Sequence, residues 1–221
     1  MIRTLKLVFL LIFFWSCDEK TKPQNPPNII VIVTDDQRWD AIGYAGNEII
    51  VTPEQDQLAE EGTYFNKAFV TTPICGASRA TIITGLYERK HNFTLGGTIL
   101  DSIYNQQNYA YQLKKKGYHT GFFGKLGIKN NGGLTESFSE HEVYDRNNNF
   151  KDQRGYYYKT IGKDTVHLTR YTGHKAISFI ENSTKDQPFC LSISFSAPHA
   201  HDGAWEGIQK QYFWQEEVDN Y

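Results

Sequence analysis

The chain has 221 residues, of which 39% are hydrophobic and 22% charged, so it suits one globular domain or part of a larger one. Lys and Arg number 23 against 25 Asp and Glu, and this balance argues against a nucleic-acid-binding protein, which needs a basic excess. Only three cysteines occur, too few for a disulfide scaffold or a four-sulfur zinc site. Each cysteine is therefore interpreted singly.

Residues 1–16 have the pattern of a secretory signal. Arg3 and Lys6 precede an unbroken apolar run, residues 7–15, that is too short to span a bilayer. We expect this signal to be removed during export.

Cleavage after Ser16 places Cys17 at the new N-terminus, in a setting that resembles a relaxed bacterial lipobox. The expectation is a lipoprotein of the bacterial cell envelope, periplasmic or on the outer membrane, that touches the membrane through its lipid anchor only. The alternative is an ordinary secretory signal in which Cys17 has no role. Residues 17–27 are charged and rich in proline, which predicts a polar tether to a folded part over residues 28–221.

The folded part begins as an α/β protein, with strands and helices in alternation. Residues 28–34 form a β-branched apolar run without alternation, typical of a strand covered on both faces by helices. Thr52 and Pro53 predict the start of a helix that ends at Gly62. Residues 64–70 predict a second strand.

The remaining segments continue this alternation and favour a mostly parallel or mixed central sheet flanked by helices. A strand over 189–196 alternates bulky with small residues, which predicts one bulky and one small face. Residues 130–150, rich in Asn, Gly and Ser, predict a loop. The other predicted elements are helices over 78–84, 109–116 and 168–180 and a strand over 118–123.

Two adjacent carboxylates, Asp35 and Asp36, follow the first predicted strand. Ligands of parallel sheets gather beyond the carboxyl ends of the strands. Adjacent carboxylates repel each other, and a hard cation commonly relieves this repulsion. The alternative is a capping or loop pair with no metal.

Cys75 stands at the start of a short predicted helix, and Arg79 follows one turn later. The free N–H groups and partial positive charge of a helix N-terminus can bind an oxyanion beside Cys75. The alternative is a buried, inert cysteine. Lys125 and His199 follow two other predicted strands, and each is compatible with a structural role when taken alone.

Together these segments resemble the type I sulfatases of the alkaline phosphatase superfamily. Residues 75–79, Cys-Gly-Ala-Ser-Arg, with Thr84-Gly85, resemble the family signature, whose cysteine is oxidised to Cα-formylglycine. Further similar segments follow in the family's order: 28–36 with its Asp pair, 52–69, 117–125 with its Gly-Lys, and 188–199 with its Pro-His. The resemblance covers nearly all of residues 28–201 and implies the N-terminal part of an alkaline phosphatase-like catalytic domain.

The resemblance implies a calcium ion bound by Asp35, Asp36 and an oxygen of the modified residue 75. It also implies a formylglycine-generating maturation enzyme as a partner for Cys75. Family members continue past residue 221 and take further calcium ligands and a second lysine from that later half. The sequence thus looks truncated, and we expect the 221-residue chain alone to be inactive.

The implied activity is hydrolysis of sulfate monoesters. The hydrated aldehyde at Cys75 attacks sulfur, while Arg79 holds the hydrate and Lys125 bridges it to the sulfate. His199 protonates the leaving alcohol, a role that requires a pKa near the working pH. Many relatives carry a histidine where Gly127 stands, so that role is unassigned here.

Two other functions stay open. Phosphatases and phosphodiesterases share the fold but generally place Thr or Ser where Cys75 stands, and a non-catalytic, truncated envelope protein fits the loss of the histidine. Export favours sulfated glycans as substrates, with an aryl sulfate or another small ester as the alternative. The loop over 130–150 and Tyr156, Tyr157 and Tyr158 either line a sugar subsite or are ordinary surface or core residues.

Overall fold

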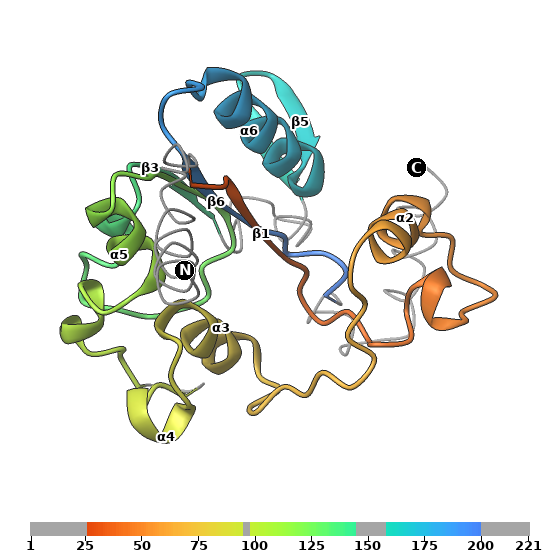
Figure 1. Ribbon diagram of the computed structural model, residues 1–221, viewed down its shortest axis with the longest axis horizontal. Coiled ribbons are helices and arrows are strands. Elements are labelled where there is room, and N and C mark those ends of the chain that lie inside the picture. The colour runs from red at the N-terminus through yellow and green to blue at the C-terminus, as the bar shows by residue number, and fades with distance from the viewer. Residues whose placement is uncertain (1–25, 95–97, 145–157, 200–221) are drawn as a thin grey trace, which may run out of the picture.

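The structure is a computed structural model that describes residues 26–94, 98–144 and 158–199 (Figure 1). The predicted signal, Cys17 and most of the predicted tether lie outside the described residues, as do Tyr156 and Tyr157. Among the helices of the described ranges, none has the length and apolar character needed to cross a bilayer.

A parallel four-stranded sheet lies at the centre of the fold. All three strand pairings are parallel, so the carboxyl ends of the strands meet at one edge. Val33, Ser194 and Gly124 lie side by side at this edge. The strand order is β1 (Ile29–Val33), β6 (Phe189–Ser194), β2 (His119–Gly124) and β3 (Glu140–Val143). The predicted α/β class and three of its strands are confirmed.

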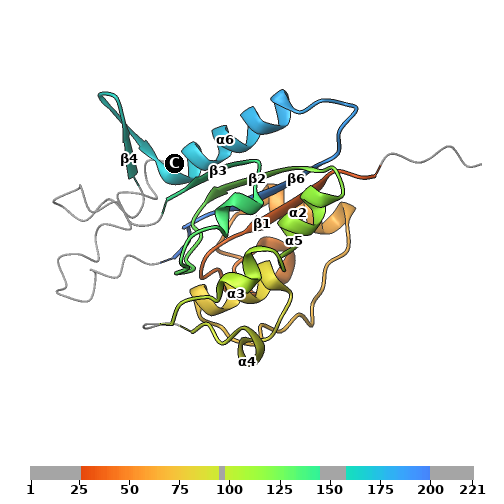
Figure 2. The same cartoon turned by 90° about the vertical axis from the view of Figure 1, so that its left-hand side faces the viewer.

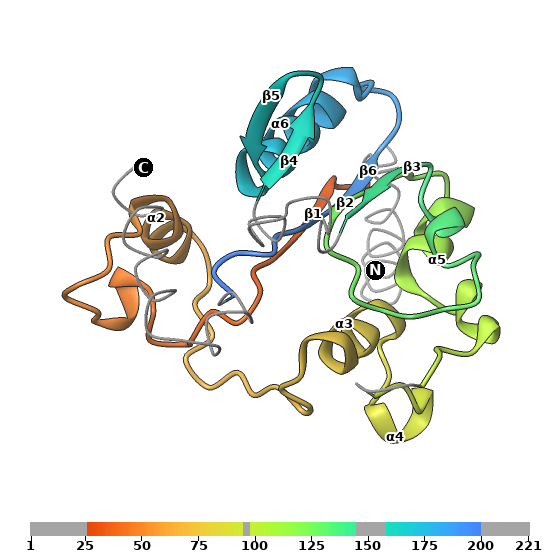
Figure 3. The ribbon, with the colours of Figure 1, turned by 180° about the vertical axis from the view of Figure 1, so that it is seen from behind.

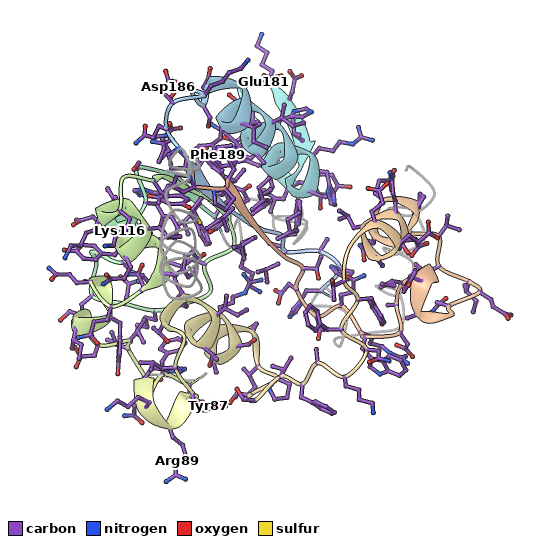
Figure 4. The ribbon with its side chains drawn as sticks, in the orientation of Figure 1. Tyr87, Arg89, Lys116, Glu181, Asp186 and Phe189 are labelled. Atoms are coloured by element: carbon purple, nitrogen blue, oxygen red, sulfur yellow. The ribbon has the colours of Figure 1, made fainter. Side chains whose placement is uncertain are left out.

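Helices cover both faces of this sheet (Figure 2). On one face, Phe179 of α6 (Leu168–Asn182) packs in a cluster with the bulky side chains of β6, among them Phe189 (Figure 4). On the other face, α3 (Cys75–Thr84) and α5 (Tyr109–Lys115) pack over the small side chains of β6 and over Phe122. The predicted bulky and small faces of this strand are confirmed.

Local capping explains where these helices begin and end. The Asn108 side chain accepts a hydrogen bond from the Tyr111 N–H and so caps α5. Gly85 closes α3 in the left-handed conformation, as the sequence predicts. Pro53 begins α2 (Pro53–Glu61), but the Thr52 hydroxyl accepts from the Gly43 N–H instead of capping the helix.

The smaller elements lie around this core. An antiparallel hairpin of β4 (Tyr158–Ile161) and β5 (Asp164–His167) lies beside α6 (Figure 3). Helix α2 lies at the opposite end of the molecule from α5 (Figures 1 and 3). The short helices are α4 (Glu88–His91) and the 3-10 turns Gly43–Ala45, Ser102–Asn105 and Thr135–Ser137.

Three sequence predictions are wrong. Residues 64–70 form no strand, and their aromatic side chains Phe65 and Phe69 are exposed. The predicted loop over 130–150 contains strand β3, which pairs with β2 although its sequence, Glu-His-Glu-Val, has no apolar run. Strand β1 is covered on one face only, because α6 packs over β6 and β2 and leaves Ile30 and Ile32 exposed by 47% and 54%.

Candidate active site

Five of the six predicted site residues line one open cavity of about 480 Å³ at the carboxyl edge of the sheet. Three chain segments supply them: the end of β1, the first turns of α3 and the segment after β6. Parallel pairing explains why the residues after β1 and β6 meet, because each strand delivers its following residues to the same edge. Helix α3 follows α2 instead of a strand and brings its N-terminus to the same cavity. The five residues are Asp35, Asp36, Cys75, Arg79 and His199.

The sixth residue, Lys125, joins the site through Asp35. Lys125 Nζ donates to Asp35 Oδ2 at 2.5 Å, and Arg79 Nη2 lies 3.6 Å from Asp35 Oδ1. All three side chains are buried, and Asp35 is only 4% exposed. Two cations against one carboxylate leave a formal charge of +1 in the wall of the cavity. Because burial weakens screening by solvent, this charge favours an anionic ligand.

The guanidinium of Arg79 is fixed mainly through one end. Nη1 donates to the Lys125 carbonyl at 2.8 Å and to Ser194 Oγ, while Nη2 makes a longer contact of 3.4 Å with the Phe195 carbonyl. Nε is buried and has no hydrogen-bond partner within the described ranges. The arginine therefore depends on its Nη1 contacts for its orientation.

Gly127 lies against these two cations. Its φ is +63°, and a Cβ there would lie 3.1 Å from Arg79 Cδ and 3.7 Å from Lys125 Cε. The first turn of α3 is equally close, since a Cβ on Gly76 would lie 2.8 Å from the Gly127 carbonyl oxygen. The side chains of Arg79 and Lys125 therefore lie where a side chain on residue 127 would begin.

Cys75 and Cys190 have different surroundings. Cys75 lines the cavity at the N-terminus of α3, beside free N–H groups and partial positive charge. Cys190 is buried in β6, and burial raises the pKa of its thiol to about 11. Cys75 is thus the accessible thiol of the two, and Cys190 is the inert one.

Asp36 and His199 also line the cavity, Asp36 as an exposed residue and His199 as a half-buried one. Asp36 is exposed and has a φ of +64°, a left-handed conformation that costs energy in a residue other than glycine. The His199 N–H donates to the Ser196 carbonyl at 3.2 Å in the turn after β6. Both side chains are therefore accessible to a ligand in the cavity.

The carboxylates that line the cavity are ligands of the chemical type that binds a hard cation. Carboxylates such as those of Asp35 and Asp36 are the type of ligand that Ca²⁺ prefers. Calcium takes six to eight oxygens, and the described ranges contain no group of three or more His, Cys, Asp and Glu that could hold a metal ion. The described residues thus offer two carboxylates to a hard cation, and that of Asp35 is already engaged by Lys125 and Arg79.

Sequence reasoning missed the contribution of Ser194 and Gly124. Ser194 lies on the small face of β6, and its position under Arg79 depends on the order of the strands. Gly124 ends β2 at a φ of +117°, where a Cβ would lie 1.9 Å from the Ser194 carbonyl oxygen. The available signal was the repeated small residue on one face of the strand over 189–196.

Solved structures identify the class of this fold. A structure described as a complex with the substrate D-glucosamine-2-N,6-O-disulfate has a TM-score of 0.64 and 27% identity, covering 78% of this chain and 35% of the other. Ps i-CgsB in complex with k-i-k-neocarrahexaose has a TM-score of 0.67 and 27% identity, covering 80% and 46%. The fold is that of the alkaline phosphatase-like hydrolases.

The family follows from the sequence comparison. The family profile described as Sulfatase matches residues 27–220, and the chain belongs to the sulfatase family. It is 30% identical over 203 residues to an N-acetylglucosamine-6-O-sulfatase of Bacteroides thetaiotaomicron, covering 89% of this chain and 35% of that relative. The chain spans between a third and a half of the length of these relatives.

Proposed function

We propose that the protein carrying this chain hydrolyses sulfate monoesters, and that its substrates are sulfated glycans. One observation carries the proposal: a buried cluster of net positive charge, Asp35 with Arg79 and Lys125, lies in the wall of the cavity that Cys75 opens into. A sulfate monoester resists attack because its oxygens repel a nucleophile, so a site must neutralise that charge. The relatives named for glycan substrates support the substrate class.

Each described residue has a part in this reaction. Arg79 and Lys125 neutralise the ester oxygens, and their burial strengthens this effect. His199, which lines the cavity, gives a proton to the leaving alcohol. Cys75, oxidised by a maturation enzyme to formylglycine, provides a hydrated aldehyde as the nucleophile, and Ca²⁺ held by Asp35 and Asp36 supplies further positive charge.

Cys75 also distinguishes this proposal from phosphatase activity. A hydrated aldehyde has a second hydroxyl that expels the sulfate after the alcohol has left, whereas a serine or threonine has no such route. The presence of cysteine at the cavity end of α3 therefore favours the sulfatase reaction over that of a phosphatase or phosphodiesterase on the same fold.

The test uses the complete protein, co-expressed with a formylglycine-generating enzyme. We expect hydrolysis of sulfated glucosamine or another sulfated oligosaccharide, and slower or no hydrolysis of the corresponding phosphate ester. Mass spectrometry should find the Cys75 peptide with sulfur replaced by oxygen and two hydrogens lost. An unmodified thiol in active enzyme, or wild-type turnover by Cys75→Ala, would refute the proposed nucleophile.

The metal site is tested separately with Asp35→Ala and Asp36→Ala. Each substitution removes a carboxylate, so calcium binding measured by calorimetry and turnover should both fall by at least about tenfold. The 221-residue chain alone should bind calcium weakly, because its described residues offer too few donors. Wild-type turnover in either variant would assign the metal to other residues.

We further propose that the protein is a lipoprotein of the bacterial cell envelope, anchored through Cys17. The apolar run of residues 7–15 and the lipobox-like setting of Cys17 support this location. Metabolic labelling with a palmitate analogue should mark the protein, and Cys17→Ser should abolish the label. Labelling that survives the substitution would contradict the anchor and leave the proposed activity untouched.

A further inference from the structure

The buried hydroxyl of Ser194 contacts the guanidinium of Arg79 and the backbone carbonyl of Lys125. Ser194 Oγ accepts a hydrogen bond from Arg79 Nη1 and donates one to the Lys125 carbonyl at 2.7 Å. Arg79 Nη1 donates to the same carbonyl at 2.8 Å. The serine hydroxyl, the guanidinium and the carbonyl thus form a closed triangle, which we name the Ser194 clamp.

The backbone around the Ser194 clamp has little freedom to adjust. The Lys125 N–H donates to the Ser194 carbonyl at 2.8 Å. Gly124, one residue earlier, approaches that carbonyl so closely that a Cβ would lie 1.9 Å from its oxygen. Because the ends of β2 and β6 are already in contact, a shift of either strand cannot replace a lost hydroxyl.

Arg79 has few other contacts that fix its orientation. Its Nη2 contacts are long, at 3.4 Å to the Phe195 carbonyl and 3.6 Å to Asp35, and Nε has no hydrogen-bond partner in the described part of the chain. Rotation of the guanidinium about its last bonds is therefore opposed mainly through Nη1. Without the clamp, the angle between guanidinium and Lys125 becomes variable.

We infer that Ser194 is a positioning residue for sulfate-ester hydrolysis, acting through Arg79 and Lys125. The inference rests on the proposed function. Ser194 is buried against the Arg79 guanidinium and the Lys125 backbone and does not line the cavity, so it is not a catalytic residue. Its effect should fall on kcat more than on KM, because preorganised charge matters most where the transition state develops its own charge.

The first experiment compares Ser194→Ala with Ser192→Ala in the complete, matured protein. Ser192 is a matched control: it is buried two residues earlier on the same face of β6, and its hydroxyl bonds Tyr109 at 2.6 Å instead of the site. We expect Ser194→Ala to lower kcat for a sulfate ester by about 10- to 100-fold. The control should stay within about 3-fold of wild type while losing a similar Tm.

A double-mutant cycle separates positioning from a general structural effect. In an Arg79→Lys background no guanidinium remains for the clamp to hold, so Ser194→Ala should lower kcat by less than about 3-fold. The same loss in both backgrounds, or wild-type kcat in Ser194→Ala alone, would overturn the inference.

A chemical readout is independent of turnover. Phenylglyoxal modifies accessible arginines, and mass spectrometry of the α3 peptide reports its rate at Arg79. We expect modification at least about 3-fold faster in Ser194→Ala and unchanged in Ser192→Ala, because a guanidinium that keeps only the Lys125 carbonyl as a partner of Nη1 is more mobile. If wild type hydrolyses no sulfate ester, the proposed function fails, and this rate still decides whether the clamp exists. Equal rates in wild type and Ser194→Ala would refute it.

Discussion

Gly127 stands where the resemblance to the family predicts a histidine, and its conformation opposes a side chain. Its φ of +63° is unfavourable for any residue with a Cβ, by about 1–2 kcal/mol. The Cβ would also lie 3.1 Å from Arg79 Cδ. A substitution at residue 127 therefore cannot add an imidazole without backbone strain and close contact with Arg79.

Gly127→His should consequently fail to improve the enzyme. We expect Gly127→Ala and Gly127→His to lower both the free energy of unfolding, measured in urea, and kcat. Gly162→Ala is the control, since Gly162 has the same φ of +63° but no atom of the described residues lies within 4 Å of its Cβ position. The control should show the conformational cost alone, about 1–2 kcal/mol, with kcat unchanged. Higher activity in Gly127→His would contradict this account.

His91 is a buried residue whose protonation state affects the stability of the fold. It is buried, its Nδ1 accepts from the Phe93 N–H at 3.1 Å, and its Nε2 lies 3.1 Å from Thr81 Oγ1. Burial lowers the pKa of His91 below 6.5, against the opposing effect of Glu88. Protonation removes the acceptor at Nδ1, so the neutral form suits the folded state.

The sign of the pH effect follows from this lowered pKa. The stability that neutral His91 provides is present above pH 6.5 and is lost as the pH falls through its folded-state pKa. We expect Tm to fall between pH 7 and pH 5, and His91→Gln to reduce that fall. His141→Gln, at an exposed position on β3, should leave the slope unchanged. Identical slopes for wild type and His91→Gln would show that another group causes the acid sensitivity.

At the scale of the element, apolar runs decided which strands were predictable. Strands β1, β2 and β6 carry enough apolar residues to be recognised, and Gly85 and Gly117 mark helix ends. Strand β3 is polar because it lies at the edge of the sheet, so no periodicity reveals it. The apolar residues of 64–70 predicted a strand that has no pairing partner in the described sheets.

Glu142 explains how polar β3 is held in place. Its carboxylate accepts hydrogen bonds from Lys159 of β4 and from Tyr171 of α6, and it pairs with Lys175 at 3.0 Å. Burial alone would raise the pKa of Glu142, but the hydrogen bonds from the two lysines and Tyr171 outweigh it and lower the pKa to about 2. One carboxylate thus connects the sheet, the hairpin and the helix.

Glu142→Gln should therefore destabilise the protein near neutral pH by about 1 kcal/mol, measured by urea unfolding. The stability from the ionised carboxylate is present above pH 4.5 and is lost as the pH falls toward 2, so the variant and wild type should converge in acid. Glu140→Gln is the control: Glu140 is 52% exposed and pairs with His119, so its loss should change stability by less than about 0.5 kcal/mol. A constant difference at all pH values would exclude the ionised carboxylate as the cause.

At the scale of the whole molecule, the parallel sheet assembles the site. Strand order places the residues after β1 and β6 beside each other. The sequence predicts that Asp35, Asp36 and His199 follow strands, but not that these two strands are neighbours. The direct pairing of Lys125 with Asp35 was not predictable, because it depends on the distance between loops of different strands. The role of Ser194 was not predictable either, because a serine indicates no particular function until its neighbours in the fold are known.

The exposed edge of the sheet has a consequence for handling the protein in solution. Ile30 and Ile32 of β1 are exposed on the face of the sheet where α6 packs over β6 and β2, and no strand of the described ranges pairs with the outer edge of β1; such edges promote intermolecular pairing. The 221-residue chain should therefore form concentration-dependent oligomers, visible as a mass increase in multi-angle light scattering. The Ile30→Lys, Ile32→Lys double variant should shift the chain toward monomer, whereas Ile49→Lys, at a 90% exposed position outside the strands, should not. A monomeric wild-type chain at millimolar concentration would show that this edge does not promote intermolecular pairing.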